Sequence, residues 1–217
     1  PGLTTIVEGL PAGMPVSATE ISAELARRRL GYGRGRRMAL EKDDLEILGG
    51  VRFGLTLGSP VAVLIRNTEW PKWQKEMSAE PGTSKRQLQT PRPGHADLAG
   101  MIKYDTRDAR DILERASARE TAARTVVGYL SKQLLAAVDI RIVSHVVAIG
   151  SVGSPEGVVP LPADQSVVDG SPVRALDENA ATAMIAEIEQ ARKDRNTLGG
   201  VFEVLVHGLP VGVGSHV

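Results

Sequence analysis

The feature that most constrains the fold is the way two hydrophobic patterns are segregated along the chain. Short β-like runs cluster within residues 37–66, among them 45–48, 51–56 and 61–66, and Asp-Asp, Gly-Gly and Gly-Ser-Pro turns separate them. Apolar residues at helical spacing occupy other segments and predict helices near 17–30, 108–137 and 178–194. Clustered strands beside separate helices favour an α+β fold with antiparallel sheets over a doubly wound parallel sheet. We expect residues 1–217 to belong to a single domain with no internal boundary.

The remaining segments divide into strands and one long irregular stretch. Further strands are expected at residues 4–9, 140–149 and 201–206. Residues 151–175 are rich in Pro, Gly and Ser and are expected to form a loop that could hold a short strand, and Asp177 could cap the helix at 178–194. Residues 68–107 show little periodicity of either kind and contain four prolines and three glycines. An irregular stretch of that length is usually functional or disordered.

Charge and cysteine content exclude several classes of protein. The chain has 26 basic and 26 acidic side chains, and a net charge of zero argues against holding nucleic acid by a global basic field. The absence of cysteine excludes disulfides, thiolate zinc sites and cysteine nucleophiles, and it fits a reducing compartment. No pair of histidines has the spacing of a metal site, so no metal is expected. No apolar run approaches the length of a membrane span, and we expect a cytoplasmic protein.

The densest chemical feature is an arginine-rich segment at residues 27–37, which holds six arginines within eleven residues. Guanidinium groups suit bidentate binding of phosphate and carboxylate. Glycines at 31, 33 and 35 would let the backbone approach a ligand closely. Three interpretations stay open for this segment alone: a solvated helix end with salt bridges, a site for a small anion, and a nucleic-acid contact.

A second feature is the loop Thr90–Gly100, where two prolines stiffen the backbone around His95. Gly94 makes this histidine approachable, and Arg92 lies three residues before it. A fixed histidine near an arginine is suited to act as a general acid or to stabilise charge. A single loop histidine is also common as plain polar surface, so both interpretations stay open.

The third feature lies on the expected helix 108–137. Arg115, Ser117 and Arg119 would fall within about one helical turn, and the two arginines would share a face at i,i+4 spacing. Glu114 and Glu120 could neutralise this pair of like charges, or a bound anion could do so. Together, the segments 27–37, 92–95 and 115–119 could line one pocket for a small molecule carrying a phosphate and carboxylates.

Seven segments together resemble one known family. In chain order they read RRRLGYGRGRRM, GVRFGLTLGSPV, NTEWPKW, RPGHADLAGMIKY, DARDILERASARETAAR, SPVRA and RNTLGG. This series resembles chorismate synthase over essentially the whole chain, and RPGHAD together with LERASARET is highly specific for that family. The resemblance implies part of a chorismate-synthase-like fold. It also implies a lyase that converts 5-enolpyruvylshikimate-3-phosphate to chorismate and phosphate by 1,4-anti elimination with reduced FMN.

The resemblance further implies roles for individual residues. His95 matches the family histidine that lies near the flavin ring and would be catalytic. Substrate contacts would come from Arg28, Arg34, Arg37, Arg92, Ser117 and Arg119. Flavin contacts would come from Arg115, Ala116 and Ser117, and Arg28 and Arg34 would also meet a nicotinamide nucleotide, with NADPH as a source of reduction.

Two parts of the family pattern are missing from the printed chain: a G-E-S-H-G motif that would directly precede Pro1, and a later flavin-binding half. We therefore expect a fragment that does not turn over alone. By resemblance, the longer protein would be a homotetramer with no nucleic-acid or membrane partner. Two alternatives stay open: an arginine-rich nucleic-acid-associated module, and a non-catalytic domain whose 68–107 loop binds a partner. The first would show a steep fall of affinity with salt.

Overall fold

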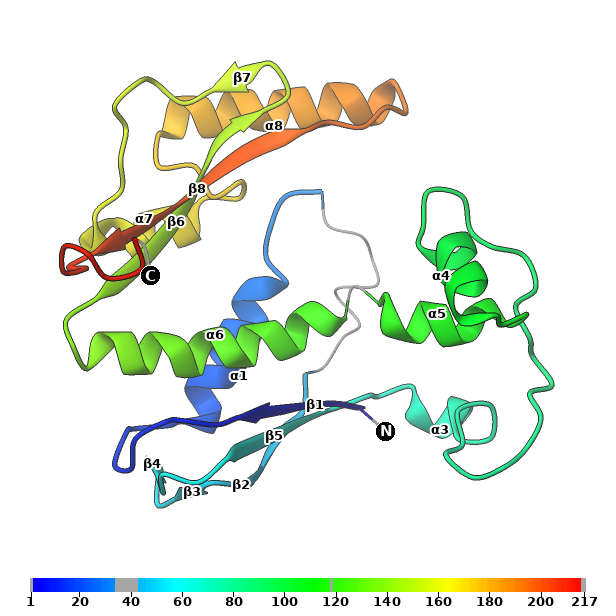
Figure 1. Ribbon diagram of the computed structural model, residues 1–217. Helices are drawn as coiled ribbons and strands as arrows, with labels where there is room; N and C mark the ends of the chain where they lie inside the picture. The colour runs from blue at the N-terminus through cyan, green and yellow to red at the C-terminus, as the bar shows by residue number, and fades with distance from the viewer. Residues whose placement is uncertain (1, 34–42, 118, 216–217) are drawn as a thin grey trace. The chain divides into compact units, whose positions relative to one another are not determined.

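The structure, a computed structural model, describes residues 2–33, 43–117 and 119–215 (Figure 1). The chain divides into two compact units, each described here by itself. The first unit comprises 1–25 and 42–128, and the second unit comprises 26–41 and 129–217. Both contain helices and antiparallel strands, so the predicted α+β class is confirmed. The expectation of one domain without an internal boundary stays a prediction.

The first unit contains a three-stranded antiparallel sheet in the order β1-β5-β2. Its strands are β1 (Gly2–Val7), β2 (Leu45–Gly49) and β5 (Val61–Arg66). Alternate side chains of the central strand are buried, as expected for a sheet with one face on a core. Helix α1 (Ala18–Arg28) adds the fully buried Ile21 to this core.

A tight hairpin follows β2. Strands β3 (Val51–Arg52) and β4 (Leu55–Thr56) pair with each other across Phe53 and Gly54. Both turn residues have positive φ, at 50° and 77°, which is the conformation of the two-residue turns that match strand twist. The expectation of a continuous strand over 51–56 is therefore wrong, because Gly54 allows the chain to reverse at that point.

The stretch from 68 to 107 contains more helix than its pattern indicates. Helix α3 (Trp70–Trp73) is short, but α4 (Asp97–Tyr104) has two full turns and packs against α5 (Ala109–Arg115). The two helices approach closely at Gly100, where an added Cβ would lie 2.4 Å from the side chain of Ile112. The glycine that weakened the helical pattern in the sequence is thus the residue that allows this packing.

The loop between α3 and α4 is held by contacts to the start of α5. The carboxylate of Asp108 accepts hydrogen bonds from the backbone N–H groups of Arg110 and Leu88, at 3.0 and 2.9 Å. The guanidinium of Arg110 lies 4.7 Å from the ring centroid of Trp73 and donates to the carbonyl of Arg86. These contacts hold residues 73, 86 and 88 of the irregular segment against the start of α5.

The expected single helix over 108–137 is interrupted. Helix α5 ends at Arg115, and α6 (Glu120–Ala136) begins only five residues later. Between them, the hydroxyl of Ser117 accepts from the backbone N–H of Arg119 at 3.3 Å. A serine side chain that bonds a nearby backbone group competes in this way with helix continuation.

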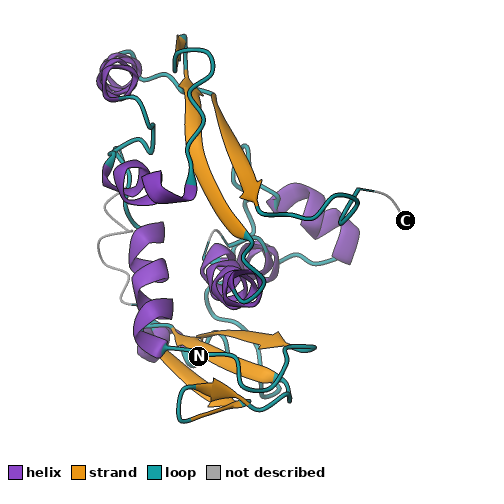
Figure 2. Cartoon of the chain, turned by 90° about the vertical axis from the view of Figure 1, so that its left-hand side faces the viewer, coloured by secondary structure: helices purple, strands orange, loops and turns teal. Residues whose placement is uncertain are grey.

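The second unit contains a three-stranded antiparallel sheet in the order β7-β6-β8 (Figure 2). Its strands are β6 (Arg141–Ile149), β7 (Val152–Gly153) and β8 (Gly200–His207). Helix α8 (Glu178–Lys193) packs against β6 and β7. The predicted N-cap of this helix is confirmed, because the carboxylate of Asp177 accepts from the backbone N–H of Ala180 at 2.7 Å.

The 151–175 region was expected to be a loop with at most a short strand. The structure places there a 3₁₀ turn, η1 (Pro162–Asp164), followed directly by helix α7 (Gln165–Gly170). A small core forms next to α8 from Val173, Ala175, Ala180, Ala181 and Met184. Within the described ranges, no helix combines the length and the apolar character needed to cross a bilayer.

Candidate active site

The backbone between Arg92 and His95 makes a tight turn at the start of α4. Pro93 and Gly94 occupy its central positions, and Gly94 has φ of 69°. The N–H of His95 lies 3.4 Å from the carbonyl of Arg92. Proline followed by a glycine with positive φ is typical of a type II turn. The local sequence therefore brings the side chains of Arg92 and His95 to one place.

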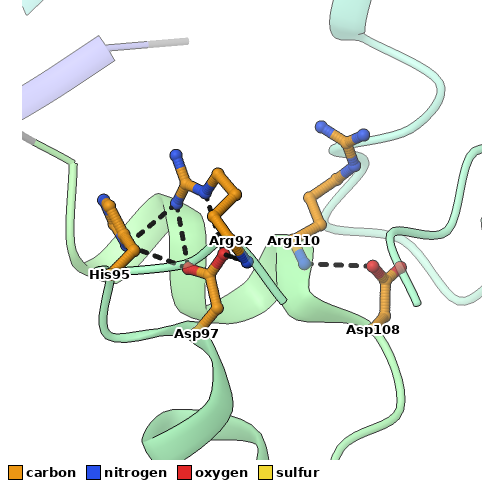
Figure 3. A network of polar contacts seen from close by, with 5 residues as sticks. All are labelled: Arg92, His95, Asp97, Asp108 and Arg110. Atoms are coloured by element: carbon orange, nitrogen blue, oxygen red, sulfur yellow. Dashed lines mark hydrogen bonds and ion pairs between the residues drawn. The ribbon is translucent and has the colours of Figure 1, made fainter. Parts of the chain in front are cut away.

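Asp97 joins these two side chains (Figure 3). The backbone N–H and the Nε of Arg92 both donate to its Oδ2, at 3.0 and 2.8 Å. Its Oδ1 lies 2.9 Å from Nη2 of Arg92 and 2.9 Å from Nδ1 of His95. The carboxylate is almost fully buried, with 2% of its side chain exposed. One buried carboxylate thus fixes both a guanidinium and an imidazole.

These contacts set the charge states of Arg92 and Asp97. Hydrogen bonds from the side chain and the backbone of Arg92 hold the pKa of Asp97 far below its ordinary value, against the opposing effect of desolvation. The same side-chain hydrogen bond raises the pKa of the Arg92 guanidinium. The cluster therefore contains a permanent cation and a permanent anion at neutral pH, with His95 beside both.

Part of this cluster faces outward. The side chains of Arg92 and His95 are 45% and 34% exposed, whereas Asp97 lies beneath them. In Figure 3, Nη1 of Arg92 and the far side of the His95 ring point away from Asp97. The prediction of a fixed histidine beside an arginine is therefore matched by geometry that leaves both groups a face for a ligand.

The second group of predicted residues follows α5. Arg115 is the last residue of that helix, and its guanidinium lies 4.9 Å from the ring centroid of Tyr104 at the end of α4. Ala116 is the C-cap, Ser117 forms the turn described above, and residue 118 lies outside the described residues. Arg115 and Arg119 do not share a helix face, contrary to the sequence expectation, because the helix ends between them.

Arg119 is held by contacts that the sequence did not indicate. Its Nη1 lies 3.2 Å from the carboxylate of Asp43, and its Nη2 donates to the carbonyl of Arg66 at 3.1 Å. The side chains of Arg119 and Asp43 are 16% and 2% exposed. Glu120, one of the two carboxylates considered as a neutralising partner, pairs instead with Arg124 at 2.8 Å. Part of the positive charge of Arg119 is therefore already balanced within the protein.

The arginine-rich segment begins in the second unit. Arg28 ends α1 and is half-buried, whereas Arg34 and Arg37 lie outside the described residues. The described start of the segment is anchored by an ion pair of 3.3 Å between Arg27 and Asp169 and by a hydrogen bond of 2.7 Å from the Tyr32 hydroxyl to Glu189.

The structure thus joins Arg92 and His95 directly and places Arg115, Ser117 and Arg119 in the same unit. Sequence reasoning missed the carboxylates that hold the arginines, namely Asp43, Asp97 and Asp169. Only Asp97 had a local signal, because it lies two residues after the histidine in RPGHAD. The other two partners are distant in sequence and could not be found from spacing.

Anchored guanidinium groups beside a half-exposed imidazole can bind an anion and accept or deliver a proton. A family model described as chorismate synthase matches residues 1–217. The chain therefore belongs to the chorismate synthase family.

Individual relatives agree with this assignment. The chorismate synthases of Salinispora tropica and Streptomyces coelicolor are 55% and 56% identical to the chain over 226 positions. The alignments cover 100% of this chain but 58% and 57% of those proteins, so the chain spans a little over half of their length. A crystal structure of chorismate synthase matches with a TM-score of 0.74 and 39% identity, over 96% of this chain and 55% of that one.

Proposed function

We propose that this chain forms part of an enzyme that converts 5-enolpyruvylshikimate-3-phosphate to chorismate and phosphate by 1,4-anti elimination. The family match over all 217 residues is the observation that carries this proposal. The Arg92–His95–Asp97 cluster supports it, because the cluster provides a fixed cation and an imidazole at an exposed face. The comparisons do not favour the nucleic-acid alternative over this function.

The substrate is an anion with one phosphate and two carboxylates, and we propose that guanidinium groups bind it. Arg92 is well suited, because its Nη1 points away from Asp97 and its side chain is 45% exposed. Arg119 is only 16% exposed, and its two outer nitrogens face Asp43 and the carbonyl of Arg66. We therefore expect it to contribute less to anion affinity than the more exposed Arg92 does. Arg28, Arg34, Arg37 and Ser117 complete the proposed substrate set.

Members of the family use reduced FMN, and the residues after α5 fit such a group in their chemistry. Arg115, which lies over the ring of Tyr104, and the hydroxyl of Ser117 can both donate hydrogen bonds, and they suit an electron-rich ring or a phosphate. We propose that Arg115, Ala116 and Ser117 contact the flavin. When bound, reduced FMN would supply electron density to the breaking C–O bond.

The protein's own contribution is electrostatic. Guanidinium groups would stabilise the negative charge that grows on the departing phosphate, and His95 would hold or move a proton beside the flavin. Arg28 and Arg34 stay proposed contacts for a nicotinamide nucleotide, with NADPH as the source of reduction. We further propose that the longer protein is a cytoplasmic homotetramer.

The role of His95 can be tested by His95→Ala in the longer protein that contains this chain. We expect kcat to fall by about 100-fold or more, which is the usual contribution of a positioned acid or base. The substrate Kd should change far less, because the arginines supply most of the anion affinity. Steady-state kinetics and fluorescence titration measure the two effects separately.

His207→Ala provides the control. His207 lies at the end of β8 and bonds the carbonyl of Pro160, and it belongs to none of the proposed contacts. This variant should keep kcat within about twofold, as expected for a substitution away from the site. Unchanged turnover in His95→Ala would exclude His95 as a catalytic residue.

A further inference from the structure

Asp97 has no role among the proposed substrate and cofactor contacts, yet it makes the shortest links in the cluster. Four nitrogen atoms surround its carboxylate at 2.8–3.0 Å. Three belong to Arg92 and always carry hydrogen: its backbone N, Nε and Nη2. The fourth is Nδ1 of His95, which carries hydrogen in only one of the two neutral forms of the ring.

The hydrogen bonds around Asp97 can be counted. An ionised carboxylate has about four lone-pair positions, two on each oxygen. The backbone N and Nε of Arg92 fill the two positions on Oδ2, and Nη2 of Arg92 fills one on Oδ1. The last position is filled only if Nδ1 of His95 carries a hydrogen. Because the carboxylate is buried, water does not readily replace that donor, and an unfilled acceptor would be costly.

A competing arrangement exists. Nη2 of Arg92 also lies 3.0 Å from Nδ1 of His95, so it could donate to a bare Nδ1. The two arrangements leave different groups unsatisfied. If Nδ1 carries hydrogen, one N–H of Arg92 loses its protein partner, but that side chain is 45% exposed and can bond water. If Nδ1 is bare, the buried carboxylate loses a donor. The first arrangement has the lower cost.

We propose that Asp97 is a positioning residue for His95, and that it holds the neutral ring with hydrogen on Nδ1 and the lone pair of Nε2 facing outward. Nε2 can then accept one proton from a ligand and return it, while the Nδ1–H bond to Asp97 stays in place. The tautomer follows from this chain alone. Its use in catalysis rests on the proposed function.

The experiment is nitrogen-15 NMR of the histidine rings in the chain labelled on histidine, at a pH where the rings are neutral. The signals of His95 are assigned by their loss in His95→Gln. In the unaltered chain, we expect Nδ1 to show the shift of a protonated nitrogen and Nε2 that of a bare one. A His95 ring with hydrogen mainly on Nε2 would overturn the proposal, with no variant of Asp97 needed.

Asp97→Asn gives a second, directional test. Oδ2 accepts two N–H groups of Arg92, so the carbonyl oxygen of the asparagine should occupy that side. Its NH₂ group then faces Nδ1 and can only donate, so the ring must become an acceptor there. We expect the tautomer ratio to move toward Nε2–H by about tenfold or more, since hydrogen bonds to charged groups are worth more than that factor.

Asp105→Asn is the matched control. Asp105 is the exposed C-cap at the other end of α4, and its loss changes the net charge by the same amount. The His95 tautomer should not change in this variant. An unchanged tautomer in a folded Asp97→Asn chain would also overturn the proposal.

The two proposals fail in different ways. If Asp97→Asn shifts the tautomer while His95→Ala keeps full turnover, the positioning role stands and the catalytic role of His95 fails. If His95→Ala abolishes turnover while the tautomer is insensitive to Asp97, the reverse holds.

Discussion

At the residue scale, the lowered pKa of Asp97 has a consequence for stability. The folded-state pKa lies below the ordinary value of 3.8, so the ionised carboxylate stabilises the folded chain above about pH 3.8. That contribution is lost as the pH falls from 3.8 toward the folded-state pKa. We expect Asp97→Asn to be less stable than the unaltered chain at neutral pH, with a difference that shrinks below pH 3.8. Urea unfolding at several pH values measures it.

Asp105→Asn again serves as the control, because it has the same net charge as Asp97→Asn. Comparing the two variants removes the general effect of losing one carboxylate. A stability difference between Asp97→Asn and the unaltered chain that stays constant from pH 7 to well below 3.8 would contradict the assigned cause.

The sequence indicated Arg92 and His95, but it did not indicate the carboxylate that holds them. Arg92 and His95 were indicated because they lie three residues apart in a loop that two prolines stiffen. Asp97 was missed because a carboxylate in the first turn of a helix is ordinary, since it suits the helix dipole. Asp97 is buried and has four donors because the Arg92–His95 turn places both side chains against it, and residue spacing in the sequence does not predict that arrangement.

At the scale of elements, the packing of α4 on α5 depends on Gly100. An added Cβ would lie 2.4 Å from the buried side chain of Ile112, which must then shift. Such overpacking costs about 1–3 kcal/mol, and it is offset by the roughly 1 kcal/mol by which alanine exceeds glycine in a helix. We expect Gly100→Ala to lower the free energy of unfolding by up to about 2 kcal/mol, as measured by urea denaturation.

The chain offers a matched comparison in Gly128 of α6. A Cβ added there meets no atom within 4 Å, so only the gain in helix propensity applies. Gly128→Ala should raise the free energy of unfolding by about 0.5–1 kcal/mol. If the two variants changed stability in the same direction, close contact at Gly100 would not be the cause.

Elements with a clear period were predictable, and those decided by one residue were not. Strand β5 and helix α8 agree with their predicted positions within a residue or two, because each has a regular apolar face. The β3–β4 hairpin and the break after Arg115 each depend on a single residue, Gly54 or Ser117, in a local conformation. Periodicity averages over several residues and does not register such events.

At the scale of the whole molecule, several arginines are neutralised locally by buried or partly buried carboxylates. Arg27, Arg92 and Arg119 each have a carboxylate partner within 3.3 Å, and all three partners are partly or fully buried. The arginine-rich appearance of the sequence therefore overstates the cationic surface. Composition alone could not show which arginines have a carboxylate partner within the protein.

Strand β8, one of the two outer strands of the sheet in the second unit, should favour association between molecules in solution. Among the described strands, β8 pairs only with β6, and it exposes Val201, Phe202, Val204 and Val206. An apolar strand at a sheet edge favours association between molecules. We expect the purified chain to associate as its concentration rises and Val204→Lys to reduce that association. Light scattering over a concentration series measures the effect.

Val167→Lys on α7 is the control, because Val167 and Val204 are both 56% exposed and lie in the same unit. It adds the same charge at a position outside the sheet. Equal reductions in both variants would show that added charge, rather than the β8 surface, controls association.

The hydrogen bonds around Asp97 also constrain how positions 92, 95 and 97 can change during evolution. A change at position 92 or 95 removes at least one hydrogen-bond donor from the buried Asp97, and a change at position 97 removes the carboxylate that holds both Arg92 and His95. Single mutations in this triplet should therefore be selected against, even where the altered residue itself never meets a ligand. Across related proteins, a lineage that has replaced Asp97 should also differ at His95 or Arg92. The three positions should evolve as one character.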